Sequence, residues 1–267
     1  MLNAQNGCLT IPTGEMDYIR FGSGAKTLVM IPGVGDGLKT VKGMALPFAL
    51  MYRTLAKDFT VFVFSRRRKL SPGMTTRDMA EDLNSAMEQL RLSDVALVGV
   101  SQGGMISQWL AIEHPDKVSR LILTVTTSRP NDTIRDVIRR WLKMAEQGDY
   151  KGIMLDTAER SYSEKRLKKE RFIYSLLGNV GKPKSFGRFV IHAQSCATHD
   201  ACDLLDRIAC PTLVLGGAKD QIVTGSASEE IAKRIPGAQL YMYEGLGHGL
   251  YEESPDFLPR IKAFCLQ

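Results

Sequence analysis

Short apolar runs divide the chain at intervals, and segments with helical periodicity separate them. Unbroken apolar runs of five or six residues are typical of parallel strands buried on both faces. They predict strands at residues 27–31, 60–64, 95–100, 120–125, 211–215 and 239–243. Apolar residues at helical spacing between the strands predict core helices at residues 46–57, 75–90, 102–114 and 226–234. A last helix is expected from Ser254, with a kink or a later start because of Pro259. Strands that alternate with helices indicate a mostly parallel sheet with helices on both faces, preceded by a hairpin at residues 8–22.

The strand pattern stops between Asn131 and about His199, where only helical signals occur. Apolar residues repeat at helical spacing over residues 134–145 and again over 172–177, and a third helix is expected over 183–198. A stretch this long without strands predicts a helical insertion in the sheet domain.

Charge marks the same insertion. Residues 129–200 hold 15 Lys/Arg and 9 Asp/Glu, whereas the rest of the chain is neutral. We therefore expect residues 1–128 and 201–267 to form one core domain, and residues 129–200 to be a helical cap inserted in it. The basic charge is interpreted as a solvated helical surface, with attraction of an anionic ligand as the alternative.

Composition limits the class of protein. Of 267 residues, 44% are hydrophobic, which supplies a sizeable core, and no apolar run is long enough to cross a bilayer. The first residues lack the basic and apolar regions of a signal peptide. Five cysteines, an odd number without framework spacing, indicate free thiols in a reducing compartment. We expect a cytoplasmic protein that binds no membrane.

A serine between two glycines, Gly99-Val100-Ser101-Gln102-Gly103, joins a predicted strand to a predicted helix. In that context the pattern G-x-S-x-G indicates a nucleophile elbow. The turn is strained, and a side chain at Gly99 or Gly103 would collide with neighbouring backbone. The helix that follows directs its free N–H groups and its positive dipole end at the reaction site. Ser101 is therefore the predicted nucleophile.

A serine nucleophile needs a base, and the base needs a carboxylate that orients it. Asp220 comes five residues after the strand at 211–215, and His248 lies among glycines after the last strand. The other three histidines lie at a helix end or in the helical insertion: His114, His192 and His199. The order Ser101, Asp220, His248 fits this architecture, in which catalytic groups gather at the carboxyl ends of the strands. We predict Asp220 as the orienting acid and His248 as the base.

Two backbone N–H groups must stabilise the oxyanion that forms during attack. One is expected from Gln102, the residue after the nucleophile. The other is expected from the glycine-rich loop at residues 32–37, where we predict Val34, with Gly35 as the alternative.

The chain resembles the α/β-hydrolase superfamily over nearly its whole length. The resemblance rests on Gly-Val-Ser101-Gln-Gly, Pro-Gly-Val-Gly at residues 32–35, Leu-Val-Leu-Gly-Gly-Ala-Lys-Asp220 and Gly-Leu-Gly-His248. It implies an α/β-hydrolase fold, with an eight-stranded, mostly parallel sheet and an inserted helical cap, together with an acyl-enzyme mechanism and no cofactor. A serine nucleophile argues against haloalkane dehalogenases and epoxide hydrolases, which use aspartate at that position.

Three features depart from that family's pattern. Pro32 replaces the histidine that often opens the oxyanion loop, and Ser65-Arg-Arg-Arg-Lys69 replaces the common Asp-Arg-Gly-x-Gly stretch. The second departure predicts a loop of different shape. Asp36 lies beside the oxyanion loop, where it either disfavours anionic substrates or caps a turn.

Two other clusters suggest different chemistry. His192, Cys196 and His199 share one helix face, with a spacing that metal ligands can adopt. Residues 66–69, Arg-Arg-Arg-Lys, could indicate nucleic-acid binding, but a site of that kind needs a wider basic surface and stacking aromatic residues. We expect packing residues and a solvated loop instead, and hence no metal and no nucleic-acid partner.

These observations predict a serine hydrolase that acts on carboxylic esters of small to medium apolar acyl groups. Trp141, Met144 and Met154 are candidates for an acyl pocket, and they fit the interior of the cap equally well. C–C bond hydrolase, thioesterase and lactonase activities use the same three residues and stay open, as does a non-catalytic binding protein on this fold. The expected partner is a small ester-type molecule, and the oligomeric state is left unspecified.

Overall fold

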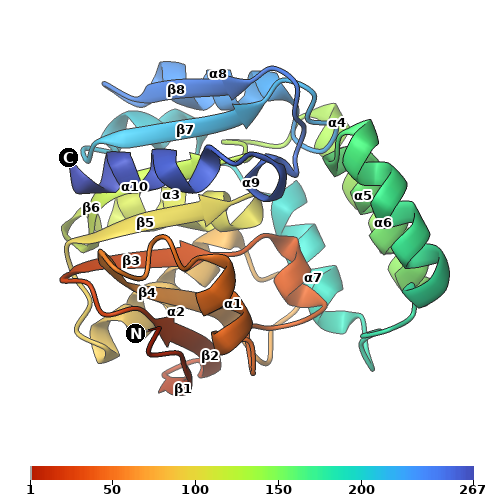
Figure 1. Cartoon of the computed structure of the whole chain (residues 1–267), viewed down its shortest axis with the longest axis horizontal. Coiled ribbons are helices and arrows are strands. Elements are labelled where there is room, and N and C mark those ends of the chain that lie inside the picture. Colours follow the sequence, from red (N-terminus) through yellow and green to blue (C-terminus); the bar gives the residue numbers. More distant parts are fainter. Residues whose placement is uncertain (1) are drawn as a thin grey trace.

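Eight strands form a single sheet in the order β1-β2-β4-β3-β5-β6-β7-β8 (Figure 1). The computed structural model describes residues 2–267, apart from the side chain of Ser175. The strands are β1 (Gln5–Ile11), β2 (Gly14–Phe21), β3 (Lys26–Ile31), β4 (Phe59–Arg67), β5 (Val95–Val100), β6 (Val118–Thr124), β7 (Thr212–Gly217) and β8 (Gln239–Tyr243). β1 and β2 form the predicted antiparallel hairpin, β2 pairs antiparallel with β4, and all other pairs are parallel. The expected α/β architecture is confirmed.

Helices cover both faces of this sheet (Figure 1). The face with α1, α9 and α10 and the face with α2, α3 and α8 each have their own core. The core helices are α1 (Ala45–Met51), α2 (Thr76–Gln89), α3 (Gln102–Glu113), α8 (Gly225–Arg234), α9 (Leu250–Glu253) and α10 (Phe257–Leu266), with short 3-10 helices η1 (Val34–Gly37), η2 (Pro115–Lys117) and η3 (Cys202–Arg207). Thr75 begins α2 with a capping box, in which its side chain accepts from the Asp78 N–H.

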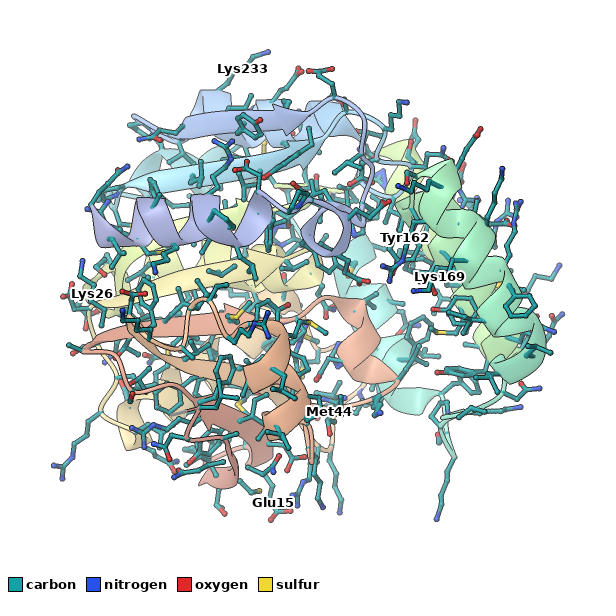
Figure 2. The ribbon with its side chains drawn as sticks, viewed as in Figure 1. Glu15, Lys26, Met44, Tyr162, Lys169 and Lys233 are labelled. Carbon is teal, nitrogen blue, oxygen red and sulfur yellow. The ribbon has the colours of Figure 1, made fainter. Side chains whose placement is uncertain are left out.

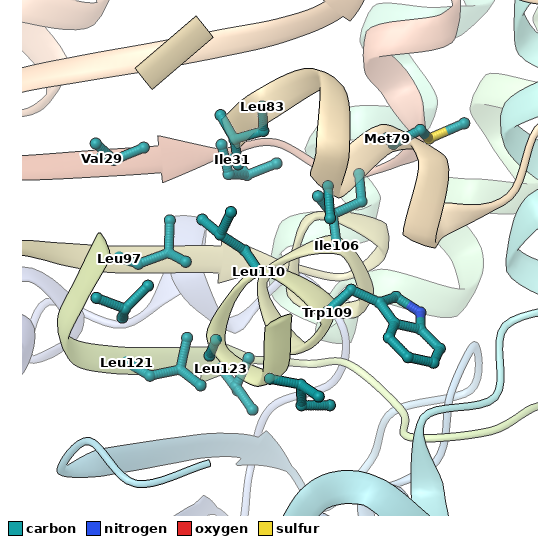
Figure 3. Close-up of a cluster of buried hydrophobic side chains, with 14 of the residues drawn as sticks. Val29, Ile31, Met79, Leu83, Leu97, Ile106, Trp109, Leu110, Leu121 and Leu123 are labelled. Atoms are coloured by element: carbon teal, nitrogen blue, oxygen red, sulfur yellow. The ribbon is translucent and has the colours of Figure 1, made fainter. Parts of the chain in front are cut away.

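The two cores follow from the alternation of side chains along buried strands. In β3, Val29 and Ile31 pack with α2 and α3 on one face (Figure 3), whereas Leu28 and Met30 pack toward α1 and α10 on the other. Successive side chains of a strand point to opposite faces, so a strand covered on both sides is apolar at every position. The apolar runs of the inner strands have this origin, whereas β8 lies at the edge of the sheet and is largely exposed.

Four helices lie between β6 and β7 and project past the carboxyl ends of the strands (Figure 1). They are α4 (Asp132–Glu146), α5 (Tyr150–Ser161), α6 (Glu164–Leu177) and α7 (Gly187–Ala197). The side chains of Asn131, Asp149 and Ser163 accept from backbone N–H groups in the first turns of α4, α5 and α6, which explains where these helices begin. Met105 of α3 joins the apolar cluster of the insertion and so connects it to the core.

Several expectations of local structure need correction. The helix expected at 46–57 ends at Met51, and the chain then turns before β4. β4 extends to Arg67, because Met16 of β2 pairs with it, so Arg66 lies in a strand and not in the expected solvated loop. The apolar stripe at 172–177 is helical but largely exposed: Phe172, Leu176 and Leu177 have 67%, 68% and 55% of their surface accessible.

At the C-terminal end, α10 starts at Phe257 and places Pro259 in its first turn, where no intrahelical N–H is needed. The expected later start is thus confirmed. Within residues 2–267, no helix combines the length and the apolar character that a bilayer crossing requires.

Candidate active site

Ser101 occupies a strained turn between β5 and α3. Its φ of +53° and ψ of −120° lie in a region that side-chain-bearing residues rarely adopt, so the turn must be held by its surroundings. The Ser101 N–H donates to the Thr124 carbonyl at 2.9 Å, and the Ser101 carbonyl accepts from the Thr126 hydroxyl at 2.7 Å. These bonds to β6 and to the segment after it fix both peptide groups of the serine.

The glycines around Ser101 are required by close packing. A Cβ on Gly103 would lie 2.0 Å from the carbonyl oxygen of Ile31, and one on Gly99 would lie 2.6 Å from the Gly103 oxygen. A Cβ on Gly33 would lie 3.3 Å from the Ser101 Cβ and 3.7 Å from its Oγ. The loop after β3 therefore lies directly against the serine, as the oxyanion prediction requires.

His248 and Asp220 are brought together by the loops after β8 and β7. The His248 Nδ1 lies 2.8 Å from Oδ2 of Asp220, and only 6% and 7% of the two residues are exposed. The other carboxylate oxygen, Oδ1, accepts from the N–H groups of Ile222 and Val223 at 2.8 and 3.0 Å. Because an ionised carboxylate only accepts, Nδ1 is the donor, which leaves a lone pair on Nε2.

One cavity of about 580 Å³ lies against the candidate site. Ser101, His248 and Val34 line it, together with apolar side chains of the core domain and of the insertion. Of the predicted acyl-pocket residues, Trp141 and Met154 line the cavity. Met144 packs instead against the apolar cluster inside the insertion. Gln102 is fully buried, with its side chain directed away into a polar network.

Four polar side chains, those of Tyr162, Arg166, Glu170 and Glu252, form a polar wall of the cavity where the insertion meets α9. Tyr162 donates to Glu252 at 2.9 Å and lies between α5 and α9 (Figure 2), and Arg166 pairs with Glu170 at 2.6 Å. Burial, followed by the charge of Glu252, raises the pKa of Tyr162, and burial raises the pKa of Glu252. The Gly249 N–H donates to the Ser161 carbonyl at 2.9 Å, so the insertion is also bonded to the loop of His248.

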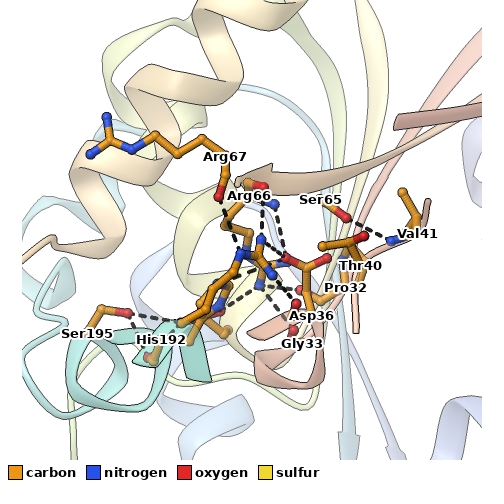
Figure 4. A network of polar contacts seen from close by, with 12 residues as sticks. Pro32, Gly33, Asp36, Thr40, Val41, Ser65, Arg66, Arg67, His192 and Ser195 are labelled. Carbon is orange, nitrogen blue, oxygen red and sulfur yellow. Dashed lines mark hydrogen bonds and ion pairs between the residues drawn. The ribbon is translucent and has the colours of Figure 1, made fainter. Parts of the chain in front are cut away.

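Beneath the loop after β3 lies a buried polar network that the sequence did not indicate (Figure 4). Asp36, 4% exposed, accepts from Arg188 of α7 at 2.7 Å and from the Arg66 N–H at 3.0 Å. Arg66 is also 4% exposed, and burial lowers its pKa to about 10. The expectation of a solvated loop is therefore wrong for Arg66. Asp36 does not face the cavity as a free charge, since two arginines hold it.

The suggested metal cluster does not converge. The His192 ring contacts Oε1 of Gln102 at 2.8 Å, whereas the His199 ring contacts the Thr76 hydroxyl at 2.8 Å. Burial lowers the pKa of His199 to about 3. In the part of the chain that the structure describes, no three His, Cys, Asp or Glu side chains are grouped to hold a metal ion.

Comparison with known proteins gives relatives of similar length. The candidate carbamate hydrolase RutD of Caulobacter sp. (strain K31) is 26% identical over 247 residues, 88% of each chain. The 3-oxoadipate enol-lactonase 2 of Acinetobacter baylyi is 24% identical and covers 69% of this chain and 68% of its own. Among solved structures, the enol-lactonase of Burkholderia xenovorans LB400 has a TM-score of 0.83 at 18% identity, over 98% of this chain and all of its own.

Residues 26–165 match the family model described as alpha/beta hydrolase fold. This segment runs from β3 through the elbow into the insertion, and the eight-stranded sheet agrees with it. The chain belongs to the α/β-hydrolase family.

Proposed function

We propose that the protein is a serine hydrolase that cleaves carboxylic esters of small to medium apolar acyl groups. The observation that carries the proposal is the convergence on one cavity of Ser101, at a strained elbow, and His248, oriented by a buried carboxylate. Strain at a functional residue persists only where the surroundings enforce it, and here bonds from two neighbouring segments do so.

In this mechanism Oγ of Ser101 attacks the ester carbonyl carbon while Nε2 of His248 takes the hydroxyl proton. The bond from Nδ1–H to Asp220 keeps the ring in the tautomer that can accept this proton. Collapse of the tetrahedral intermediate breaks the bond to the alcohol oxygen, which receives the proton from His248. Water then attacks the acyl-enzyme by the same route and releases the carboxylic acid.

Val34 and Gln102 supply the proposed oxyanion donors. Each is the first residue of a helix, so its N–H has no acceptor within that helix. Since the Ser101 carbonyl is held by Thr126 and by the Gly104 N–H, the Gln102 N–H of the same peptide points the opposite way. Each donor is worth about 3 kcal/mol of transition-state stabilisation.

The shape of the cavity supports the substrate class. Its volume lies in the range of about 300 to 1,000 Å³ that is usual for small-molecule sites. Trp141, Met154 and Phe189 line it on the side of the insertion, and Phe48 and Val63 on the side of the core. The proposed acyl group occupies this apolar part, with the insertion as its cap, and the alcohol portion faces the polar wall of Tyr162, Arg166, Glu170 and Glu252.

Lactone hydrolysis is the second candidate, because enol-lactonases occur among the curated relatives and among the similar solved structures. A lactone is a cyclic ester, so it would use the same serine, histidine and oxyanion donors. The two candidates differ in whether the cavity accommodates a cyclic ester or an open-chain ester.

A substrate panel tests the proposal. The values of kcat/KM are measured for p-nitrophenyl acetate, butyrate and decanoate, a butyryl thioester, an aliphatic lactone and a carbamate. The expected result is highest efficiency on the short and medium esters, with loss of all turnover in Ser101→Ala. A folded wild-type protein that hydrolyses no ester would contradict the proposal, and faster hydrolysis of the lactone would replace it by the second candidate.

A further inference from the structure

A single buried cation, Arg66, contacts both segments that carry the proposed oxyanion donors. It lies at the end of β4, against the loop after β3 (Figure 4). Its Nη2 donates to the carbonyl oxygens of Pro32 and Gly33, at 2.5 and 3.2 Å, and to Oε1 of Gln102 at 2.6 Å. One guanidinium group therefore joins the oxyanion loop to the first residue of α3.

The contact with Gly33 fixes the direction of the next N–H group. In a planar trans peptide the carbonyl and the following N–H point in opposite directions, and the described residues contain no cis peptide. The Gly33 carbonyl faces Arg66, so the Val34 N–H faces away from it. The Asp36 N–H holds the same carbonyl at 3.2 Å. Because Gly33 also packs against Ser101, this peptide has a defined direction relative to the serine.

The buried charges around Arg66 do not cancel. Asp36 pairs with Arg188 at 2.7 Å and lies 4.0 Å from Nη1 of Arg66. Burial, followed by the two arginines, lowers the pKa of His192 well below its usual value, so this ring is neutral near pH 7. Two cations and one carboxylate leave a net positive charge behind the loop. A cation bonded to a carbonyl polarises that peptide and strengthens its N–H as a donor.

We propose that Arg66 is a positioning residue that sets the direction and the donor strength of the oxyanion N–H group of Val34, and that it anchors this loop to the side chain of Gln102, the residue that carries the second donor. The inference rests on the proposed function, because those donors matter only if an oxyanion forms at Ser101. Arg66 touches no reacting atom and acts through the peptides that it holds.

Helix α7 completes the arrangement from the side of the insertion. Arg188 holds Asp36. The side chain of Gln102 is held by the His192 ring and by the Ser195 hydroxyl, which accepts from Nε2 of Gln102 at 2.9 Å. The insertion thus holds side chains of the segments that carry the proposed oxyanion donors and also forms part of the wall of the cavity.

Three variants test this role. Arg66→Met removes the donor but leaves Asp36 paired with Arg188, so the remaining buried charges balance and the fold is expected to persist. Arg66→Lys keeps the charge and presents one nitrogen on a shorter chain. Arg67→Met is the matched control, since Arg67 is the next residue of β4 and its side chain faces Asp82, 3.5 Å away. Arg67 joins the network only through its carbonyl, which accepts from Arg188 and which the substitution retains.

The readouts separate transition-state from ground-state binding. For Arg66→Met we expect kcat on p-nitrophenyl butyrate to fall about 100-fold with KM nearly unchanged. The Ki of a trifluoromethyl ketone, whose adduct with Ser101 places an oxyanion in the site, should rise by about the same factor, whereas the Ki of butyrate stays constant. Arg66→Lys should recover part of the loss, to about 10-fold below wild type, and Arg67→Met should match wild type.

The inference is overturned if Arg66→Met retains wild-type kcat and ketone affinity, or if butyrate binding weakens as much as ketone binding. Should Arg66→Met fail to fold, the comparison of Arg66→Lys with Arg67→Lys decides by the same criteria. A folded wild-type protein that neither hydrolyses esters nor binds the ketone overturns the proposed function itself. Active wild-type protein with unaffected Arg66 variants overturns the present inference alone.

Discussion

The bond between Asp220 and His248 allows a sharp prediction for Asp220→Asn. Oδ1 of Asp220 accepts from two backbone N–H groups, those of Ile222 and Val223. In the variant the amide oxygen must stay on that side, because an amide NH₂ there would face two donors. The NH₂ group is therefore forced toward Nδ1 of His248.

The consequence is a change of tautomer. Nδ1 must accept from the amide, so the ring proton moves to Nε2, which can then no longer accept the proton of Ser101. A triad with the wrong tautomer loses about 10⁴ in kcat, which corresponds to about 5.5 kcal/mol of transition-state stabilisation. Substrate binding in the apolar cavity does not involve this bond, so KM is expected to change little.

The assay is steady-state hydrolysis of p-nitrophenyl butyrate, with urea unfolding as a check on the fold. Asn retains the two backbone bonds, so the free energy of unfolding should fall by less than about 2 kcal/mol. Asp206→Asn, an exposed position on η3, is the matched control and should have wild-type kcat. A folded Asp220→Asn protein with kcat within 10-fold of wild type would refute the assignment of Asp220 as the orienting acid.

Three other predictions concern the elbow, the cavity and the response to acid. Gly103→Ala should lower the melting temperature and the yield of folded protein, because its Cβ meets backbone at 2.0 Å, whereas Gly245→Ala, with open space around it, should not. Met154→Ala should shift the acyl preference in kcat/KM toward longer chains, and Met144→Ala should leave it unchanged; equal shifts would show that the cavity lining is misassigned. Folding lowers the pKa of His199 from 6.5 to about 3. Between these pH values the unfolded chain binds a proton that the folded chain does not, so the free energy of unfolding decreases as the pH falls through this window, by roughly 1 kcal/mol per pH unit. Urea unfolding at pH 7 and pH 4 should show a smaller loss in His199→Phe than in wild type, and equal losses would contradict this.

The fold could be predicted because its signals are local. Strands buried on both faces are unbroken apolar runs, and a strand, a strained serine and a helix are adjacent in the chain at the elbow. His248 and Asp220 were identifiable because each follows a strand, and the carboxyl ends of parallel strands meet at one edge. The roles of these residues remain predictions, to which the structure adds the 2.8 Å bond and the shared cavity.

The network around Arg66 could not be predicted, because its contacts come from distant segments. Arg66 bonds to Gly33, 33 residues away, and to Gln102, 36 residues away. Nothing in the sequence of any of these segments indicates that they are in contact. The cationic run at residues 66–69 looks uniform, yet β4 ends at Arg67, so Arg66 is buried within the strand while Lys69, beyond its end, is exposed. The polar stretch that begins at Ser65, directly after the predicted strand at residues 60–64, was the one available signal, and it did not indicate which residues it contacts.

The rotation of the inserted helices about their own axes could not be predicted from the sequence either. Met144 and Met154 both fit an apolar helix face, and only the docking of α4 and α5 on the core decides which of them reaches the cavity. Likewise the stripe at residues 172–177 predicts a helix correctly but does not predict that its apolar side chains are largely exposed.

The most direct test of the central claim is the site of covalent modification by a fluorophosphonate, followed by peptide mass mapping. With Ser101 as the nucleophile and His248 as its base, we expect one adduct per chain, on the peptide that contains Ser101, formed at a rate that falls sharply in His248→Ala. The adduct should be absent in Ser101→Ala. A folded, homogeneous wild-type protein that carries no adduct, or carries it on another residue, would contradict the account.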